Sequence, residues 1–258
     1  MIEIAIAIAV VAFALVAIIG VMPTGLRVQQ ENREDTIVNQ DGSVWLQAIR
    51  SGALGMNYLT NHVELIEVRN QVRNLSTTNL YTAVTYERGE VKGDLRDGRD
   101  IVGILSTPRY QLDRKDQWTT NLIRAYVRAI SGAASDQLVA RNQGRSEFGF
   151  LYRMTVEVVP HNPVAGMDTN IADPNLPAEV RTNRVNLLAR ANSLQANLFD
   201  VRVAIDWPVT LVPNQPPRIG NNRREFRTMV SGTMTSTNSV PLRRPLYFLQ
   251  PTQFAPAP

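Results

Sequence analysis

The chain opens with an apolar stretch whose length predicts a helix. Residues 4 to 22 carry no polar side chain, and a helix from Met1 to Met22 would extend roughly 30 Å, about the hydrocarbon thickness of a bilayer. Ile and Ala alternate over residues 4 to 9, but both are apolar, so the alternation defines no polar face and length decides for a helix. One carboxylate, Glu3, precedes the stretch, on the side of the helix that its dipole favours.

Three helix-weakening residues mark the end of the apolar stretch: Gly20, Pro23 and Gly25. Proline removes a backbone donor and disfavours helical geometry at the residue before it, and each glycine weakens the helix further. We therefore expect the helix to kink or melt between Gly20 and Gly25, and we expect this interruption in an assembled polymer.

The next segment turns polar but keeps a helical pattern. Apolar residues recur two turns apart, Ile37 with Val44 and Val38 with Trp45, as in an amphipathic helix. Ser51 and Gly52 supply a stop signal. The pattern divides the chain into an apolar helix over residues 1–25, an amphipathic helix over 26–52, and a head over 53–258.

A signal peptide, a buried helix, a membrane anchor and a more specialised helix are four interpretations of such a start. A secretory signal has a basic n-region and a cleavable small-residue end, whereas no Lys or Arg precedes this stretch and nothing cleavable ends it. An acid at the edge of a lipid-length helix is costly to bury and usually marks a specific partner.

The segment "MIEIAIAIAVVAFALVAIIGVMPTGL" resembles the N-terminus of bacterial type IV pilins and type II secretion pseudopilins. In that family the mature chain has a short opening that includes Glu, then an apolar helix with an early proline; Glu3 and Pro23 match these features. The stretches "NLFDVRVAIDWPV" and "RREFRTMVSG" resemble C-terminal strands of large pseudopilin-like proteins. The sequence departs from the family in lacking the basic leader with its Gly, two residues expected before Met1, and a C-terminal disulfide loop. The first two departures indicate either a processed, mature-like chain that lacks its first residues or an incompletely defined N-terminus.

The resemblance implies a partner for Glu3, namely the N-terminal amine of a neighbouring subunit. A buried acid and amine are tolerable together and strongly destabilising when either is left unpaired. Intersubunit contacts are then expected at Glu3, Ala5, Ala9 and Pro23, since alanines at helical spacing permit close helix approach. Headgroup contact is the other interpretation of Glu3. The implied partners are identical subunits, the inner membrane before assembly, prepilin peptidase and the assembly machinery, with a methylated N-terminal amine.

The head is expected to be rich in antiparallel β-strands, which makes the fold class α+β with a long pilin-type helix packed on a β-rich head. Runs of β-branched and aromatic residues predict strands at 63–70, 80–88, 100–105, 148–159, 198–207 and 224–234. The stretch 118–132 has Leu122, Ala125, Tyr126 and Ala129 on one helical face and predicts a helix. Residues 160–180 and 212–224 are Pro- and Asn-rich and predict loops.

Composition and motifs point away from catalysis. The chain has 258 residues, 44% of them hydrophobic, a net charge of +4 and no cysteine, so disulfides and thiolate metal sites are impossible. It contains no phosphate loop, GxSxG or HExxH pattern, and His62 and His161 lack a ligand-spaced neighbour. The run "DLRDGRD" misses the EF-hand spacing and is interpreted as a charged turn. We expect no enzyme activity, cofactor or metal, and arginines near the C-terminus are interpreted as exposed surface rather than a nucleic-acid site.

The tail from residue 241 combines five prolines with a row of apolar side chains. The prolines rule out a helix and disfavour a central strand, yet the apolar residues need a surface to cover. That surface is either the subunit's own sheet or a neighbouring subunit; we favour the neighbour, with Tyr247, Phe248 and Phe254 as the anchors.

Two functions of different kind fit these expectations, beside a less specific third. The first is a pilin that polymerises through its N-terminal helix into a type IV pilus-like extracellular filament, starting from the inner membrane. The second is a minor pseudopilin of a type II secretion system, which would act in the periplasm. The third is a single-pass anchored protein whose head binds a ligand or acts as an enzyme. The helix chemistry is common to the first two.

Overall fold

The structure is a computed structural model that confirms the α+β class. It describes residues 2–52, 57–73, 80–87, 95, 97–112, 118–131, 150–164, 167, 170–171, 175–212, 215–239, 242 and 244–256. The helices are α1 (Ile2–Ser51), the 3-10 turn η1 (Asn57–Asn61), α2 (Gly98–Leu105) and α4 (Ala178–Asn197). The strands are β1 (Val63–Arg73), β2 (Leu80–Glu87), β3 (Tyr110–Leu112), β4 (Trp118–Arg128), β5 (Leu151–Pro160), β6 (Leu198–Thr210), β7 (Arg218–Ser231), β8 (Thr233–Ser239) and β9 (Arg244–Gln250).

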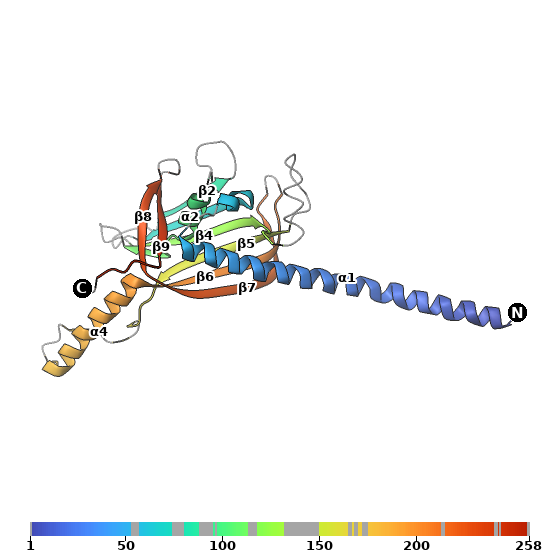
Figure 1. The fold of residues 1–258 in the computed structure, drawn as a ribbon, viewed down its shortest axis with the longest axis horizontal. Helices are drawn as coiled ribbons and strands as arrows, with labels where there is room; N and C mark the ends of the chain where they lie inside the picture. Colours follow the sequence, from blue (N-terminus) through green and yellow to red (C-terminus); the bar gives the residue numbers. More distant parts are fainter. Residues whose placement is uncertain are drawn as a thin grey trace.

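The main sheet has seven strands in the order β2-β1-β4-β5-β6-β7, with β3 paired to β4 (Figure 1). All of its strand pairs are antiparallel, while β8 and β9 form a separate antiparallel pair. The C-terminal half of α1 lies along one face of the sheet, together with α2 and β9 (Figure 1). Of the described helices and strands, none packs along the opposite face of the sheet, which we call the open face.

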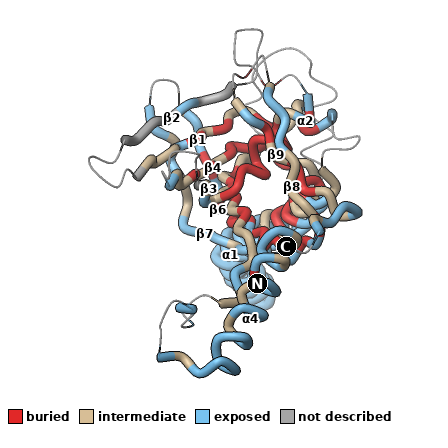
Figure 2. The backbone as a smooth tube through the Cα atoms, turned by 90° about the vertical axis from the view of Figure 1, so that its left-hand side faces the viewer, coloured by how far each residue is buried: buried red, intermediate tan, exposed pale blue. Residues whose placement is uncertain are grey.

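The core lies between the sheet and this covering layer, where the red tube concentrates in Figure 2. Along β5 every second residue is buried, from Tyr152 to Val158, because successive side chains of a strand point to opposite faces. Trp45, Ala48 and Ile49 of α1 pack into the same cluster. The amphipathic pattern of residues 26–52 therefore has its expected role, with only its C-terminal part buried.

The helix α1 runs without interruption from Ile2 to Ser51. The kink or melt that the sequence predicts between Gly20 and Gly25 is absent from the single subunit, and residues 1–25 and 26–52 belong to one helix rather than two. Pro23 lies inside this helix. The backbone hydrogen bonds of the helical turns before and after Pro23 keep the backbone helical at this residue. The end of the helix is as predicted, since Gly52 has a φ of 67°, the left-handed conformation that ends many helices.

Several elements of the head differ from the sequence prediction. Residues 218–224, expected in a loop, are the first half of β7. Residues 100–105 form most of α2 instead of a strand, because Asp97 caps the helix by accepting a hydrogen bond from the Asp100 amide at 2.9 Å. Residues 118–128 form β4 instead of a helix. Pairing with β1 on one side and β5 on the other overrides the helical spacing in this stretch. The stretch 178–197, which carries no predicted element, is the helix α4.

A buried carboxylate holds α1 on the head. Asp41 is completely buried, and its oxygens accept hydrogen bonds from the backbone amides of Ile130 at 2.8 Å and Ser131 at 2.9 Å. The Tyr152 hydroxyl donates to the same carboxylate at 2.9 Å, and the Trp45 indole N–H donates to that hydroxyl at 2.8 Å. The chain just after β4 and the strand β5 are thereby tied to one turn of α1.

Burial raises the pKa of the Tyr152 phenol well above its ordinary value of 10.0, and the neighbouring Asp41 carboxylate raises the pKa further. The phenol is therefore neutral at physiological pH and remains a donor to Asp41. This matters because a buried carboxylate is costly unless hydrogen bonds satisfy it.

A second link joins α1 to the edge strand β7. The Arg224 guanidinium donates to Asn39 at 2.6 Å and to Asp35 at 2.9 Å. Nearby, a Cβ added at Gly42 would lie 2.4 Å from the Phe226 ring. Only glycine permits α1 to approach β7 this closely.

We expect Asp41→Ala to destabilise the chain by about 3 kcal/mol or more, because the buried Tyr152 hydroxyl and two half-buried backbone amides lose their acceptor at about 1–3 kcal/mol each. Asp41→Asn, which keeps one acceptor oxygen, should cost less. The exposed Ser43→Ala on the same helix is the control and should change stability by less than about 0.5 kcal/mol. The measurement is denaturant unfolding of the full-length chain in detergent; equal stability of Asp41→Ala and Ser43→Ala would contradict the assigned role.

Candidate functional site

The most unusual surface of this protein is the free half of α1. The helix leaves the head and projects alone toward the N-terminus (Figure 1), and every residue from Ile2 to Arg33 is exposed. The exposed large apolar side chains of this half are Ile2, Ile4, Ile6, Ile8, Val10, Val11, Phe13, Leu15, Val16, Ile18, Ile19, Val21, Met22, Leu26 and Val28. Exposed apolar patches of this size mark a surface that another molecule or a membrane covers.

By length and composition, α1 is the one helix in the described part of the chain that can cross a membrane. Its first half is continuous with the part that Asp41 and Trp45 hold in the core. Fully burying one large aliphatic or aromatic side chain contributes about 1.5–3 kcal/mol. The summed gain over this half is large compared with the stability of an ordinary domain, so the free half of α1 needs lipid or protein around it.

The residues that we expect at subunit contacts all lie on this free half. Glu3 is in its first turn, and Ala5 and Ala9 are exposed one turn apart. Added Cβ atoms at Gly20 and Gly25 would meet nothing within 4 Å. Because the structure contains one chain, the contacts of Glu3, Ala5, Ala9 and Pro23 stay a prediction, and so does a helix interruption in the polymer.

The tail lies on its own subunit, which corrects the expectation that it covers a neighbour. Phe248 is only 4% exposed and belongs to the hydrophobic core. A Cβ added at Gly103 of α2 would lie 2.9 Å from its ring, and the Arg99 guanidinium stacks over it at 5.3 Å. Prolines disfavour a central strand. In agreement with this, β9 is not a central strand, because it pairs only with β8.

The other two tail anchors behave differently. Tyr247 is half-buried opposite Ser236 of β8, whereas Phe254 is 62% exposed. Ala255, the residue after Phe254, is held by Asn197, whose side chain accepts from the Ala255 amide at 2.6 Å and donates to the Ala255 carbonyl at 3.1 Å. Contact of Phe254 with a neighbouring subunit stays a prediction.

The open face of the sheet carries a network of paired charges. Asp206 accepts from Arg153 at 2.7 Å and from Arg223 at 3.4 Å, although the carboxylate itself is nearly buried. Arg202 and Arg227 stand directly opposite each other on β6 and β7. Two like charges in this position repel, and the network offsets the repulsion by placing a carboxylate between them.

That carboxylate is Asp200. It accepts from Arg202 at 2.6 Å and from Arg227 at 2.7 Å. Burial by itself raises the pKa of Asp200, but the hydrogen bonds from Arg227 and Arg202 outweigh burial and hold the pKa below its ordinary value of 3.8. Asp200 is therefore ionised throughout the physiological pH range and pairs as a carboxylate with Arg202 and Arg227.

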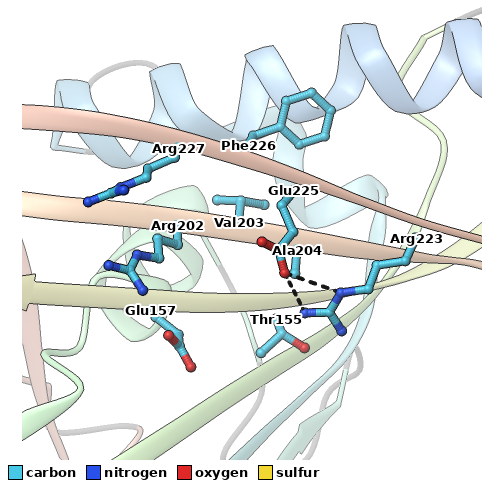
Figure 3. A pocket seen from close by; sticks show the side chains of 9 residues that line it. All are labelled: Thr155, Glu157, Arg202, Val203, Ala204, Arg223, Glu225, Phe226 and Arg227. Carbon is cyan, nitrogen blue, oxygen red and sulfur yellow. Dashed lines mark hydrogen bonds and ion pairs between the residues drawn. The ribbon is translucent and has the colours of Figure 1, made fainter.

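A groove of about 280 Å³ crosses this face, and its lining includes Arg202, Arg223 and Arg227 (Figure 3). Its floor contains Thr155 and Ala204, while Arg223 and Glu225 pair with each other along one wall at 2.8 Å. Phe226 points to the opposite side, toward α1 (Figure 3). The groove is lined by arginines and carboxylates, of which Arg223 and Glu225 form an ion pair.

The remaining sequence candidates have structural roles. In "DLRDGRD", Asp97 caps α2. The His62 ring Nδ1 lies 3.1 Å from the Ala129 carbonyl, where β1 meets the end of β4. Within the described residues, no three His, Cys, Asp or Glu side chains gather as metal ligands. Lys92 and Arg243 lie outside the described residues.

Comparison with known proteins identifies no relative: no family model, no curated protein and no solved structure matches this chain. The assignment of function therefore depends on the residues and the geometry above.

We expect Phe248→Ala to lower the free energy of unfolding by about 3–5 kcal/mol, as for other buried phenylalanines. Phe254→Ala is the matched control and should change it by less than about 0.5 kcal/mol. Denaturant unfolding of the full chain in detergent measures both. Equal effects of the two substitutions would contradict the placement of the tail.

Acid should weaken the Asp200 network. Because the pKa of Asp200 in the folded state is depressed, its contribution to stability is complete above its ordinary pKa and is lost as pH falls through the lower folded value. We expect Asp200→Asn to cost about 1.5–3 kcal/mol at pH 7 and progressively less below pH 3.8. Unfolding free energies of both proteins measured from pH 7 to about pH 2 test this; a difference that stays constant across the range would contradict it.

Proposed function

We propose that this protein is a structural subunit that polymerises through its N-terminal helix into a filament of the type IV pilus kind. The observation that supports this most directly is the combination found in α1. One continuous helix carries an exposed, membrane-length apolar half and a second half that is locked in the head. Such a helix can be held by a membrane before assembly and by neighbouring helices afterwards, because both environments bury the same side chains.

The position of Glu3 supports a polymer over a simple anchor. It lies at the far end of α1 from the head, where the head's own charged groups do not reach it. A carboxylate in that place is stable in an apolar bundle only with a cationic partner. A neighbouring chain of the same kind supplies one in its terminal amine, and this pairing also defines the register between subunits.

The proposal includes a location and excludes catalysis. Before assembly the subunit is anchored in the inner membrane, and assembly transfers it into an extracellular filament. The head is a rigid exterior whose open face carries self-neutralising charge pairs, Asp200 with Arg202 and Arg227 and Asp206 with Arg153. Such a face suits a solvated outer surface and provides no reactive group.

The test is assembly of Glu3→Ala and Glu3→Gln beside the wild-type chain, in a bacterial host that supplies the assembly machinery. We expect wild-type filaments by electron microscopy and a loss of filament yield on the order of 100-fold or more for both variants, since removing one partner of a buried pair costs about 3–5 kcal/mol. Membrane insertion and the melting temperature of the head should be unchanged, because Glu3 contacts no part of the head.

Arg33→Ala is the matched control, an exposed charge on the same helix outside the apolar half, and it should assemble normally. Normal filaments from Glu3→Ala would overturn the pairing. Absence of filaments from the wild-type chain would overturn the proposed function itself.

A further inference from the structure

Within the described residues, the helix α4 projects from the head as a second free helix. It leaves the sheet between β5 and β6 at the end of the head opposite to the projecting half of α1 (Figure 1). Ala191 is its only buried residue, and only its C-terminal part approaches β5, β6 and β8. Figure 2 shows most of its length in the colour of exposed residues. A helix of 20 residues with so little support is stabilised mainly when packing covers one of its faces.

One face of α4 is suited to such packing. Val180, Leu187 and Leu194 recur every seven residues and are all exposed, so they form a single aliphatic row. Arg190 is exposed beside this row, and the helix has a positive balance, three arginines against Glu179. The face therefore fits a partner surface that is apolar along a line and acidic at its side.

The opposite end of the same protein carries a surface of this description. On α1, Val21 and Val28 are exposed seven residues apart. Glu31 and Asp35 continue the same helical face at steps of three and four residues, which place side chains in one line. Both acids line a polar notch of about 450 Å³ between α1 and the strands β6 and β7. Asp35 already pairs with Arg224 of its own head, so Glu31 is the acid on which a contact with a partner relies.

We propose that α4 of one subunit docks on residues 21–35 of α1 in the next subunit. The aliphatic row of α4 covers Val21 and Val28, and Arg190 faces Glu31. The contact rests on the proposed function, because it joins two different surfaces at opposite ends of the molecule and so repeats from subunit to subunit without closing.

A second copy of this chain fits α4 better than a membrane does. A helix with arginines beside an aliphatic row can also lie on an anionic bilayer. The free half of α1 and α4 leave the head at opposite ends (Figure 1), however, so a membrane that holds α1 is out of reach of α4. In a stack of subunits that all point the same way, the projecting end of one faces the α1 end of the next.

Cysteine cross-linking tests the contact, because the chain has no cysteine of its own. The variant Leu187→Cys/Val28→Cys carries one thiol on each proposed surface, too far apart to meet within one subunit. Filaments of this variant, oxidised mildly and run on a non-reducing gel, should show a ladder of covalent dimers, trimers and longer species. A disulfide requires Cα atoms within about 7 Å, so a ladder reports direct contact. Leu187→Cys/Val21→Cys tests the neighbouring register, and a ladder from either pair supports the docking.

The control is Ala189→Cys/Val28→Cys, which places the thiol on the opposite, exposed face of α4. It should give no ladder. Filaments that form normally without a ladder from either Leu187 pair, or with an equally strong ladder from the Ala189 control, would overturn the docking while leaving the polymer intact. A wild-type chain that forms no filaments would overturn the proposed function, and the docking with it, so the two failures are distinguishable.

Discussion

The hydrogen bonds to Asp41 are the interaction on which the rest of the structure depends. A carboxylate inside a hydrophobic core is destabilising unless donors surround it, and here the backbone at Ile130 and Ser131 and the Tyr152 hydroxyl supply them. Because these donors come from the end of β4 and from β5, the position of α1 on the sheet is restricted along the helix and around it. The turn of α1 at Asp41 therefore also sets the direction in which the projecting apolar half of α1 leaves the head.

The two faces of the sheet differ in the side chains that they carry. The covered face is apolar and packs against α1, α2 and β9, which gives the long helix a rigid base. The open face mixes charged side chains with a few apolar ones such as Tyr126, and arginines neutralise its buried acids Asp200 and Asp206. Charge pairing across the strands keeps this face soluble and adds cross-strand contacts to the sheet.

Under the proposed function, assembly and stability depend on different parts of the chain. The residues that stabilise the head lie between Ile37 and the tail, while the free half of α1 contributes nothing to the core of the single chain. The same separation holds at the other end, where α4 depends on the head only through its C-terminal part. Surfaces that are costly to leave exposed therefore lie at both ends of an otherwise compact subunit, which suits a molecule that adds copies along one direction.

The sequence by itself determined the long apolar helix, its stop at Gly52, the α+β class and five of the strands, because these depend on local composition and period. The tertiary structure decided elements whose local pattern is ambiguous. The stretch 118–128 has helical spacing but becomes β4 between two partner strands, and residues 98–105 become helical once Asp97 caps them. Pro23 weakens a helix locally, yet the turns around it keep α1 continuous. In the sequence, the apolar side chain of Phe248 indicated only that the tail needs a surface to cover it. Whether that surface is its own core or a neighbour depends on the pairing of β9 with β8, which no local pattern encodes.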